Sequence, residues 1–431
     1  MGFTEQDVLQ YVEENDVKFI RLFFCDIFGV PKNVAVMAEA LPRVFAQGAG
    51  FDVSAVDGFM NVAEGDLLLL PDPGTLSILP WRPSTGRVAR MFCDIRRSDG
   101  TPFSGCGRTL LRTARAQAKE AGLSFRFGTE CEFYLFEMDE KGNPTLHPRD
   151  KAGYLDIAPL DRCENVRREI CLALEEMGLF PEGSHHEKGP GQNEIWCRPV
   201  DVLAAADDLI TYKSAVCTIA AQNGLFASFM PKPLPGKSGS GLHVHMAPSL
   251  LSGDALLEQT LHAFLAGILR RVGDMTLFLN TATNSYQRFG SFEAPRYVTW
   301  SSGNRAQLIR VPETGAPRLE LRSPDPLCNP YLAFTLLLQA GLEGLRNGSV
   351  PPVPTDIDLQ SAPAGTLAGL ERLPDSLGAA IEKAQDSIFV RQSLPAPVIG
   401  KILEVKRNEW ERYNRAEDKN EFEHACYFER V

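Results

Sequence analysis

The fold of this chain is organised around residues 184–195, which read Ser-His-His-Glu-Lys-Gly-Pro-Gly-Gln-Asn-Glu-Ile. This stretch places two carboxylates, Glu187 and Glu194, on either side of a Gly-Pro-Gly turn. Glycine carries no side chain that hinders a close approach to an ion or phosphate, so the turn can bring both acids toward one point. Taken alone, Glu and His near a turn are more often solvated, and the meaning of the stretch depends on matching groups elsewhere.

Two further stretches also pair polar groups. Glu130 and Glu132 flank Cys131 in an aromatic, β-favouring run over residues 127–136, and a glycine-rich loop leads into His243 and His245. Because side chains alternate along a strand, we expect each pair to lie on one face. A lone Glu-x-Glu is more often a strand with one solvated face, whereas a same-face histidine pair after a glycine loop favours a site.

Residues 318–322 combine arginine with glutamate. They read Arg-Leu-Glu-Leu-Arg, which places Arg318, Glu320 and Arg322 on one face of a strand. A structural ladder of ion pairs and a metal carboxylate between two anion-binding guanidiniums both fit this row. With Arg305 and Arg310, four arginines fall within eighteen residues of an acidic protein, which indicates a local anionic ligand.

The donor groups in these stretches favour a hard divalent ion. They supply many carboxylates, one or two imidazoles and no thiolate partner, which suits Mg²⁺ or Mn²⁺ better than zinc. A divalent metal with clustered arginine is typical of phosphoryl transfer, in which charge on the transferring oxygens must be neutralised. The sequence therefore predicts metal-assisted phosphoryl chemistry without a Walker A loop.

Length and composition limit the class of protein. A chain of 431 residues is expected to form two domains, and we predict a small, mostly β domain over 1–103 and a larger one over 104–431. In the larger domain, helices are expected over about 109–121, 165–177, 204–223, 255–271 and 329–344, alternating with short strands.

Charge and hydropathy exclude several partners. The formal charge of −11 disfavours nucleic acid and anionic membranes, and neither a signal peptide nor a run of roughly 18 apolar residues is visible. We therefore expect a cytoplasmic protein that binds no nucleic acid or membrane. Ten cysteines without a Cys-x-x-Cys pair argue against a zinc ribbon or a disulfide framework.

Taken in chain order, the motifs resemble those of the glutamine synthetase family over nearly the whole sequence. The matching segments are long and stand in family order; they are residues 50–54, 66–72, 130–132, 153–156, 185–194, 239–245, 284–295, 304–305 and 318–331.

The resemblance implies an α+β fold and a large assembly. An N-terminal β-grasp domain would precede a C-terminal catalytic domain on a curved antiparallel sheet flanked by helices. Similar proteins form homo-oligomers of two stacked rings, usually dodecamers, in which the small domain of a neighbour completes each active site.

The resemblance also implies roles for individual residues. Glu132, Glu187 and Glu194 match the ligands of the metal that orients the substrate carboxylate. Two or more Mg²⁺ or Mn²⁺ ions per site are expected, and the ligands that match the metal on the nucleotide phosphates are Glu130, His243 and Glu320.

The substrate positions carry over in the same way. ATP, the co-substrate, would be contacted by Glu182, His245, Arg310 and Arg318, together with Arg305, which is expected to act in catalysis. Glutamate-binding positions correspond to Gly239, Arg288 and Arg322. Glu293 matches the acid of a flap that closes over the intermediate, and Asp52, with Tyr154 nearby, matches the site that takes a proton from ammonium.

This sequence departs from the common family pattern near the acceptor. Val53 and Ala55 stand where many members have Gly and Ser, Ser238 replaces an Asn, and Ala247 replaces a frequent Ser. The flap from residue 288 to 293 is also one residue shorter than usual. These changes leave the metal positions intact and put the identity of the acceptor in question.

Three hypotheses follow. The leading one is ATP-dependent ligation of ammonia to the γ-carboxylate of glutamate through γ-glutamyl phosphate, with glutamate, ATP and ammonium as partners. The alternative is a γ-glutamyl amine ligase that uses a primary amine or polyamine. The third, a non-catalytic structural relative, is the weakest, because such a protein would have little reason to keep six metal ligands and at least five arginines.

Overall fold

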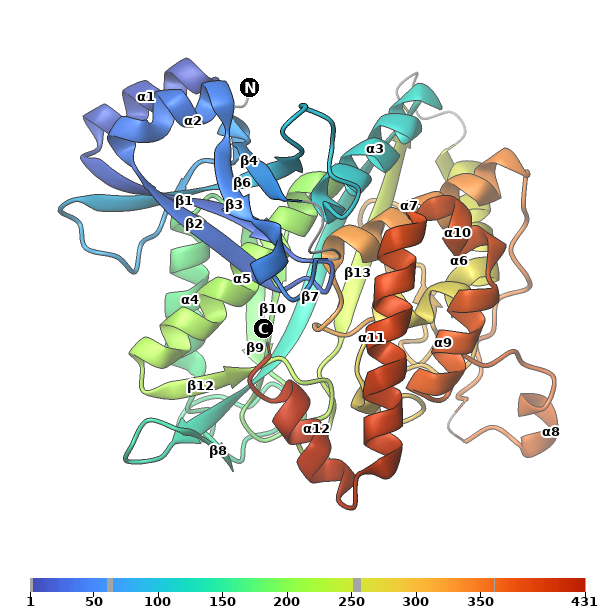
Figure 1. Ribbon diagram of the computed structural model, residues 1–431. Helices are drawn as coiled ribbons and strands as arrows, with labels where there is room; N and C mark the ends of the chain where they lie inside the picture. The colour runs from blue at the N-terminus through green and yellow to red at the C-terminus, as the bar shows by residue number, and fades with distance from the viewer. Residues whose placement is uncertain (1–2, 60–64, 251–256, 360, 431) are drawn as a thin grey trace.

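The structure, a computed structural model, describes residues 3–59, 65–250, 257–359 and 361–430 and contains two sheets (Figure 1). The expectation of an α+β fold with a β-grasp unit at the N-terminus is confirmed.

The first sheet has the strand order β2-β1-β6-β4-β3, with β5 beside β6. Its two central strands, β1 and β6, run parallel, whereas the other pairs are antiparallel. The strands are β1 (Val17–Cys25), β2 (Pro31–Met37), β3 (Ala49–Asp52), β4 (Asp66–Pro71), β5 (Ser77–Ile78) and β6 (Arg87–Arg96).

Two helices accompany this sheet, α1 (Glu5–Glu14) and α2 (Leu41–Gln47), in the region for which a small, mostly β domain was predicted. A capping box at the start of α1 provides a local reason: Asp7 accepts from the Thr4 amide at 2.7 Å, and Thr4 accepts from the Asp7 amide at 3.2 Å. Helix α1 then buries Val8 and Val12.

The second sheet has ten strands and follows the path β14-β15-β16-β13-β7-β10-β9. Its long central strand, β7 (Leu123–Met138), pairs with antiparallel neighbours on both sides, and only the short β14–β15 pair is parallel among these strands of the described chain. The remaining strands are β8 (Pro144–Pro148), β9 (Pro181–His186), β10 (Gln192–Cys197), β11 (Val200–Asp201), β12 (Leu225–Ser228), β13 (Leu242–Leu250), β14 (Trp300–Ser301), β15 (Ile309–Arg310) and β16 (Leu319–Leu321).

Helices pack around this second sheet (Figure 1). Helix α6 continues eight residues past the predicted end, to Leu279, because the apolar side chains continue beyond residue 271 and are buried. Residues 255–256 of that prediction lie outside the described part of the chain. The helices are α3 (Gly107–Glu120), α4 (Glu164–Glu176), α5 (Val202–Gln222), α6 (Leu257–Leu279), α7 (Pro330–Arg346), α8 (Ala364–Leu367), α9 (Leu377–Asp386), α10 (Ile388–Ser393), α11 (Ala396–Arg415) and α12 (Lys419–Tyr427).

A buried arginine joins the small sheet to helices α3 and α5. The guanidinium of Arg108 on α3 contacts Asp72 at 2.8 Å and Asp94 at 3.1 Å in the N-terminal part, and Asp207 of α5 at 2.9 Å. The Arg108 side chain is only 4% exposed, so these three carboxylates replace its hydration. This junction fixes the small sheet against α3 and α5.

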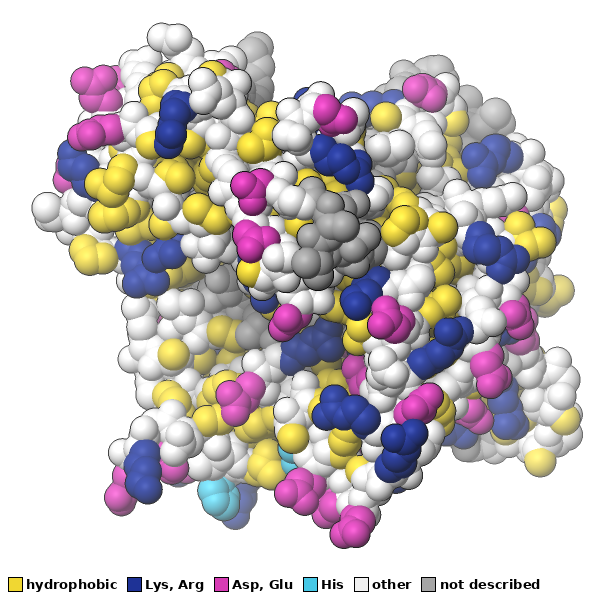
Figure 2. Space-filling model, in the orientation of Figure 1, with side chains coloured by type: hydrophobic (Ala, Val, Ile, Leu, Met, Phe, Trp, Pro, Cys, Tyr) yellow, Lys and Arg dark blue, Asp and Glu magenta, His cyan; other side chains and the backbone are white. Residues whose placement is uncertain are grey.

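The surface mixes charges of both signs. On the face in Figure 2, basic and acidic side chains are interspersed around apolar ones. Among the described residues, no helix is long and apolar enough to cross a membrane.

Candidate active site

The register of the large sheet gathers the predicted ionisable residues. Glu194 of β10 lies opposite Glu132 of β7, and Glu130 lies opposite His243 of β13. Directly opposed residues of an antiparallel pair share one face, so these side chains form a continuous row across three strands. The same register places His245 opposite Glu320.

The glycines of the β9–β10 turn make room for this row. A Cβ on Gly189 would lie 1.9 Å from the Tyr134 hydroxyl, and Gly191 has a φ of +66°, which disfavours other residues. The turn therefore lies directly against β7, and Glu187 and Glu194 approach one another as the sequence predicts. Gln192 fixes the turn, because its Nε2 donates to Glu132 Oε2 at 2.9 Å.

Glu130 is held between the two histidines of β13. Its Oε2 lies 3.1 Å from His243 Nδ1, and its Oε1 lies 2.8 Å from His245 Nε2. The predicted same-face placement of the histidine pair is therefore present.

Glu320 is fully buried and paired with two arginines. Arg310 Nη1 donates to its Oε2 at 2.7 Å, and Arg322 donates to its Oε1. His243 Nδ1 is 3.9 Å from the same Oε1. The ion pairs of Glu320 are therefore made by Arg310 and Arg322, and the predicted row of Arg318, Glu320 and Arg322 is wrong in its first member. A role of Glu320 in metal binding stays a prediction. Arg318 lies apart and donates to the carbonyls of Thr314 and Ala316.

The proton affinities of the carboxylates diverge strongly. Burial, followed by the charge of Glu187, raises the pKa of Glu132 to about 8. Burial and the charges of Glu132 and Glu130 also raise the pKa of Glu194 well above its ordinary value. For Glu130, burial opposes ionisation, but the hydrogen bonds from His243 and His245 outweigh it and lower the pKa. Negative charge is therefore crowded around Glu132 and Glu194.

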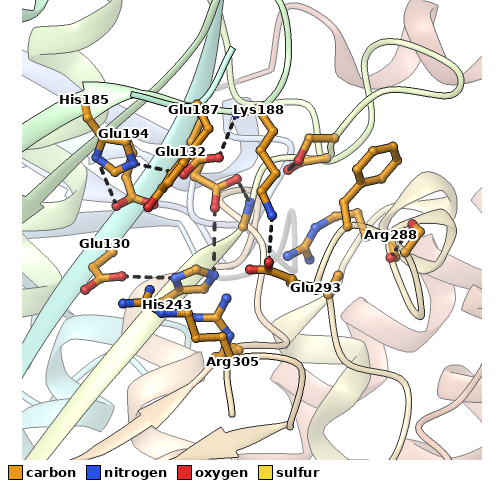
Figure 3. Close-up of a pocket in the computed structure, with 18 residues that line it drawn as sticks. Glu130, Glu132, His185, Glu187, Lys188, Glu194, His243, Arg288, Glu293 and Arg305 are labelled. Atoms are coloured by element: carbon orange, nitrogen blue, oxygen red, sulfur yellow. Dashed lines mark hydrogen bonds and ion pairs between the residues drawn. The ribbon is translucent and has the colours of Figure 1, made fainter. Parts of the chain in front are cut away.

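A cavity of about 410 Å³ opens over this row (Figure 3). Its walls come from β7, the β9–β10 hairpin, the loop before β13 and the flap over residues 288–294. The lining residues are Glu130, Glu132, Tyr154, His185, Glu187, Lys188, Glu194, Ser238, Gly239, Gly241, His243, Arg288, Ser291, Phe292, Glu293, Ala294, Arg305 and Arg322.

Six predicted site residues do not line this cavity. His245, Arg310 and Glu320 lie beside it through the contacts already described, whereas Glu182 is exposed on the edge strand β9. Arg318 lies in the loop before β16. Asp52 belongs to the small sheet, where it accepts hydrogen bonds from the Ser54 amide and hydroxyl.

Two ionisable residues that line the cavity, His185 and Lys188, were not predicted as site residues. His185 Nε2 lies 3.0 Å from Glu187 Oε1, and its Nδ1 lies 4.0 Å from Glu194 Oε1. The spacing His185-x-Glu187 follows the same alternation as the two predicted pairs, so this signal was present in the sequence. Lys188 gave no comparable signal, and neither did Gln192, which contacts Glu132 without lining the cavity, because their contacts are made by a turn and by distant segments.

The donor set fits divalent metal ions. Glu130, His243 and Glu320 offer ligand atoms within 4.8 Å of one another, as do Glu132, Glu194 and His243, and His185, Glu187 and Glu194. A cation would oppose the two effects that raise the pKa of Glu132, which are burial and, second, repulsion from Glu187. Carboxylate with imidazole suits Mg²⁺ or Mn²⁺.

The guanidinium groups at the cavity suit an anionic ligand. Arg288, Arg305 and Arg322 line the cavity. Carboxylates that hold cations and guanidiniums that hold anions therefore meet in one cavity.

Comparison with known proteins identifies relatives over most of the chain. The model of the glutamine synthetase β-grasp domain matches residues 16–98, and that of the glutamine synthetase catalytic domain matches residues 104–425. The chain is 44% identical to a glutamine synthetase of Methanosarcina mazei, with 95% of each chain covered. It is 43% identical to a glutamine synthetase of Clostridium saccharobutylicum, with 95% of this chain and 96% of the relative covered.

A solved structure has a similar fold. The structure titled "GmaS/ADP complex-Conformation 1" superposes with a TM-score of 0.87 and 31% identity, covering 97% of this chain and 99% of the other.

Proposed function

The chain belongs to the glutamine synthetase family, and we propose that it forms glutamine from glutamate and ammonia at the expense of ATP. The observation that carries this proposal is the shared cavity, in which buried carboxylates and histidine adjoin Arg288, Arg305 and Arg322. Both kinds of group are needed, because the reaction brings a triphosphate and an amino acid carboxylate together.

The metal-binding residues fall into two groups. Glu132, Glu187 and Glu194 would hold the ion beside the substrate carboxylate, and Glu130, His243 and Glu320 would hold the ion beside the nucleotide phosphates. When bound, Mg²⁺ or Mn²⁺ supplies positive charge that neutralises the phosphate oxygens and fixes their orientation. His185 is a further candidate ligand beside Glu187 and Glu194.

The remaining side chains position the two substrates. Arg322 and Arg288, with the loop at Gly239, would bind glutamate. A Cβ on Gly239 would lie 2.6 Å from Arg288 Cγ, so glycine is needed for this approach. His245, Arg310, Arg318 and Glu182 are proposed contacts of ATP.

The chemistry has two displacement steps. A γ-carboxylate oxygen of glutamate attacks the γ-phosphorus of ATP; a new O–P bond forms, and the bond to ADP breaks. Arg305 would stabilise the charge on the transferring oxygens. Ammonia then attacks the acyl carbon of γ-glutamyl phosphate, the C–N bond forms, and inorganic phosphate leaves.

Asp52 and Glu293 are proposed to remove the proton from ammonium, and Tyr154 is proposed to lie at the edge of the pocket that binds ammonium. Ammonium must lose a proton before its nitrogen can attack, and a carboxylate both attracts the cation and takes that proton. The hydroxyl of Ser54 contacts Asp52 at 2.7 Å, so one hydroxyl remains beside this carboxylate although Ala55 replaces a second.

The position of Asp52 implies that two chains contribute to each active site. It does not line the cavity of its own chain, among the residues that the structure describes. We therefore propose a homo-oligomer in which the small sheet of a neighbour brings Asp52 to the cavity, as two stacked rings and as a dodecamer.

A γ-glutamyl amine ligase is the second candidate. The replaced residues Val53 and Ala55 and the short flap favour it, because they remove polar contact near the acceptor. We rank ammonia higher, since two carboxylates for charge recognition remain and the lost hydroxyl contributes only about 1 kcal/mol.

An acceptor screen tests the proposal. Purified enzyme with Mg²⁺, ATP and glutamate is assayed for ADP and for the amide product with ammonium, methylamine, ethanolamine or a polyamine. Ammonium should give the highest kcat/KM. A tenfold advantage for an alkylamine, about 1.4 kcal/mol in transition-state binding, would replace glutamine synthesis by amine ligation. Absence of turnover with every amine would favour the non-catalytic hypothesis.

A further inference from the structure

Lys188 lies in the β9–β10 turn and has no task in the chemistry described above. It directly follows Glu187, whose Oε2 accepts from the Lys188 amide at 2.8 Å. The Lys188 side chain extends from the hairpin toward the flap, where Nζ donates to Glu293 Oε1 at 2.7 Å (Figure 3). One ion pair therefore connects the turn beside the metal-binding residues to the flap acid.

The flap is held in an unusual backbone conformation. Phe292 and Glu293 have φ values of +48° and +68°, in the left-handed region that residues with side chains rarely adopt. Such conformations persist where surrounding contacts hold them. Two contacts tie these residues to other segments: the Lys188–Glu293 pair, and Lys232, whose Nζ lies 4.9 Å from the Phe292 ring centroid.

The ion pair remains accessible to solvent. The side chain of Lys188 is 36% exposed and that of Glu293 is 45% exposed. Ion pairs with this exposure are weak, and a lysine ammonium on its flexible stem can leave Glu293 without any movement of the Lys188 backbone. A small cation that enters the cavity can therefore take its place.

We propose that Lys188 controls access of the acceptor: in the substrate-free enzyme its Nζ occupies the carboxylate of Glu293, and the acceptor ammonium must displace it. This inference rests on the proposed function, in which Glu293 binds ammonium. The two cations present the same chemistry, a positive nitrogen with N–H donors, so they compete for the same carboxylate oxygen. While Lys188 is bound, it also holds the flap across the cavity.

Substitution of Lys188 tests the competition. Lys188→Met keeps the length of the side chain and removes the charge, so the KM for ammonium should fall by about threefold or more, the equivalent of one weak ion pair. The KM values for glutamate and ATP should stay unchanged, and Lys188→Arg should restore the wild-type value. Lys237→Met is the matched control, since Lys237 is exposed in the loop before Ser238. An unchanged or higher KM for ammonium in Lys188→Met, or the same fall in Lys237→Met, overturns the proposal.

Limited proteolysis measures how firmly the flap is held, and it does not depend on ligase activity. Phe292 is 46% exposed at the flap, so chymotrypsin can cleave after it. Cleavage there should be faster in Lys188→Met than in the wild type, Lys188→Arg and Lys237→Met. Equal rates in all four proteins overturn the proposal. If the wild type makes no amide with any amine, the proposed function fails, while the cleavage rates still decide whether Lys188 holds the flap.

Discussion

Glu130 and His243 face each other across the β7–β13 pair, with His243 Nδ1 3.1 Å from Glu130 Oε2. His243 Nε2 lies 3.8 Å from Glu132 Oε1, so one imidazole bridges the two carboxylates of the same strand. Imidazoles and arginines lie close to Glu130, whereas the neighbours of Glu132 are mainly other carboxylates. A bound cation is therefore needed most beside Glu132 and Glu194.

We predict that Glu132→Gln lowers ligase activity at least about tenfold without lowering stability in the absence of metal. The amide keeps the shape of the side chain and removes one of the crowded buried carboxylates. Calorimetry with and without MnCl₂ measures the effect: Tm should rise with Mn²⁺ in the wild type and rise less in the variant.

Glu137→Gln is the control for this substitution, because Glu137 lies on the same strand with its side chain exposed. It should behave as the wild type. Equal stabilisation of Glu132→Gln and wild type by Mn²⁺ would remove Glu132 from the metal site.

We predict that two inactive variants complement each other. Asp52→Ala and Glu132→Gln should each be inactive alone, but mixed rings assembled from equal amounts should hold about a quarter of intact sites, since each site combines two chains. The measurement is glutamine formation after co-expression of the two chains, with light scattering to confirm a large assembly. Activity no higher than that of the separate variants would place Asp52 and Glu132 in one chain's site.

We predict that Arg108→Met destabilises the protein by about 3–5 kcal/mol, because it leaves the buried Asp207 without its cation, while Asp72 and Asp94 keep only the more exposed Arg112. Urea unfolding followed by fluorescence measures the change. Arg115→Met is the comparison on the same helix, since Arg115 is 31% exposed in its pair with Asp201. It should cost less than about 1 kcal/mol, and equal losses for both variants would contradict the role of Arg108.

We predict that Asp208→Asn stabilises the protein at alkaline pH. Burial, followed by the charge of Asp207, raises the pKa of Asp208 from 3.8 to about 7. The folded state therefore binds this proton more tightly than the unfolded state, and the resulting stability, complete below pH 3.8, is lost as pH rises through about 7.

Asparagine cannot ionise and avoids this loss. The variant should match the wild type near pH 4 and exceed it by on the order of 1–2 kcal/mol at pH 8. Urea unfolding at the two pH values measures the difference, and a constant offset between variant and wild type would argue against a raised pKa.

Local patterns were readable from the sequence alone. The pairs Glu130/Glu132 and His243/His245 share a face because alternation is a property of a single strand. The glycine-rich turn between Glu187 and Glu194 followed from steric freedom of the backbone, and the chain of motifs indicated the family and the α+β fold. His185 could have been found by the same alternation.

The tertiary structure alone decided which of these groups meet. Whether Glu194 faces Glu132 and Glu130 faces His243 depends on the register of strands that are far apart in the chain, and a shift of one residue would turn either side chain to the opposite face. Lys188 meets Glu293, 105 residues away, only because the flap folds over the hairpin. Strand alternation is set by neighbouring residues, whereas register and flap position are set by the packing of the whole sheet.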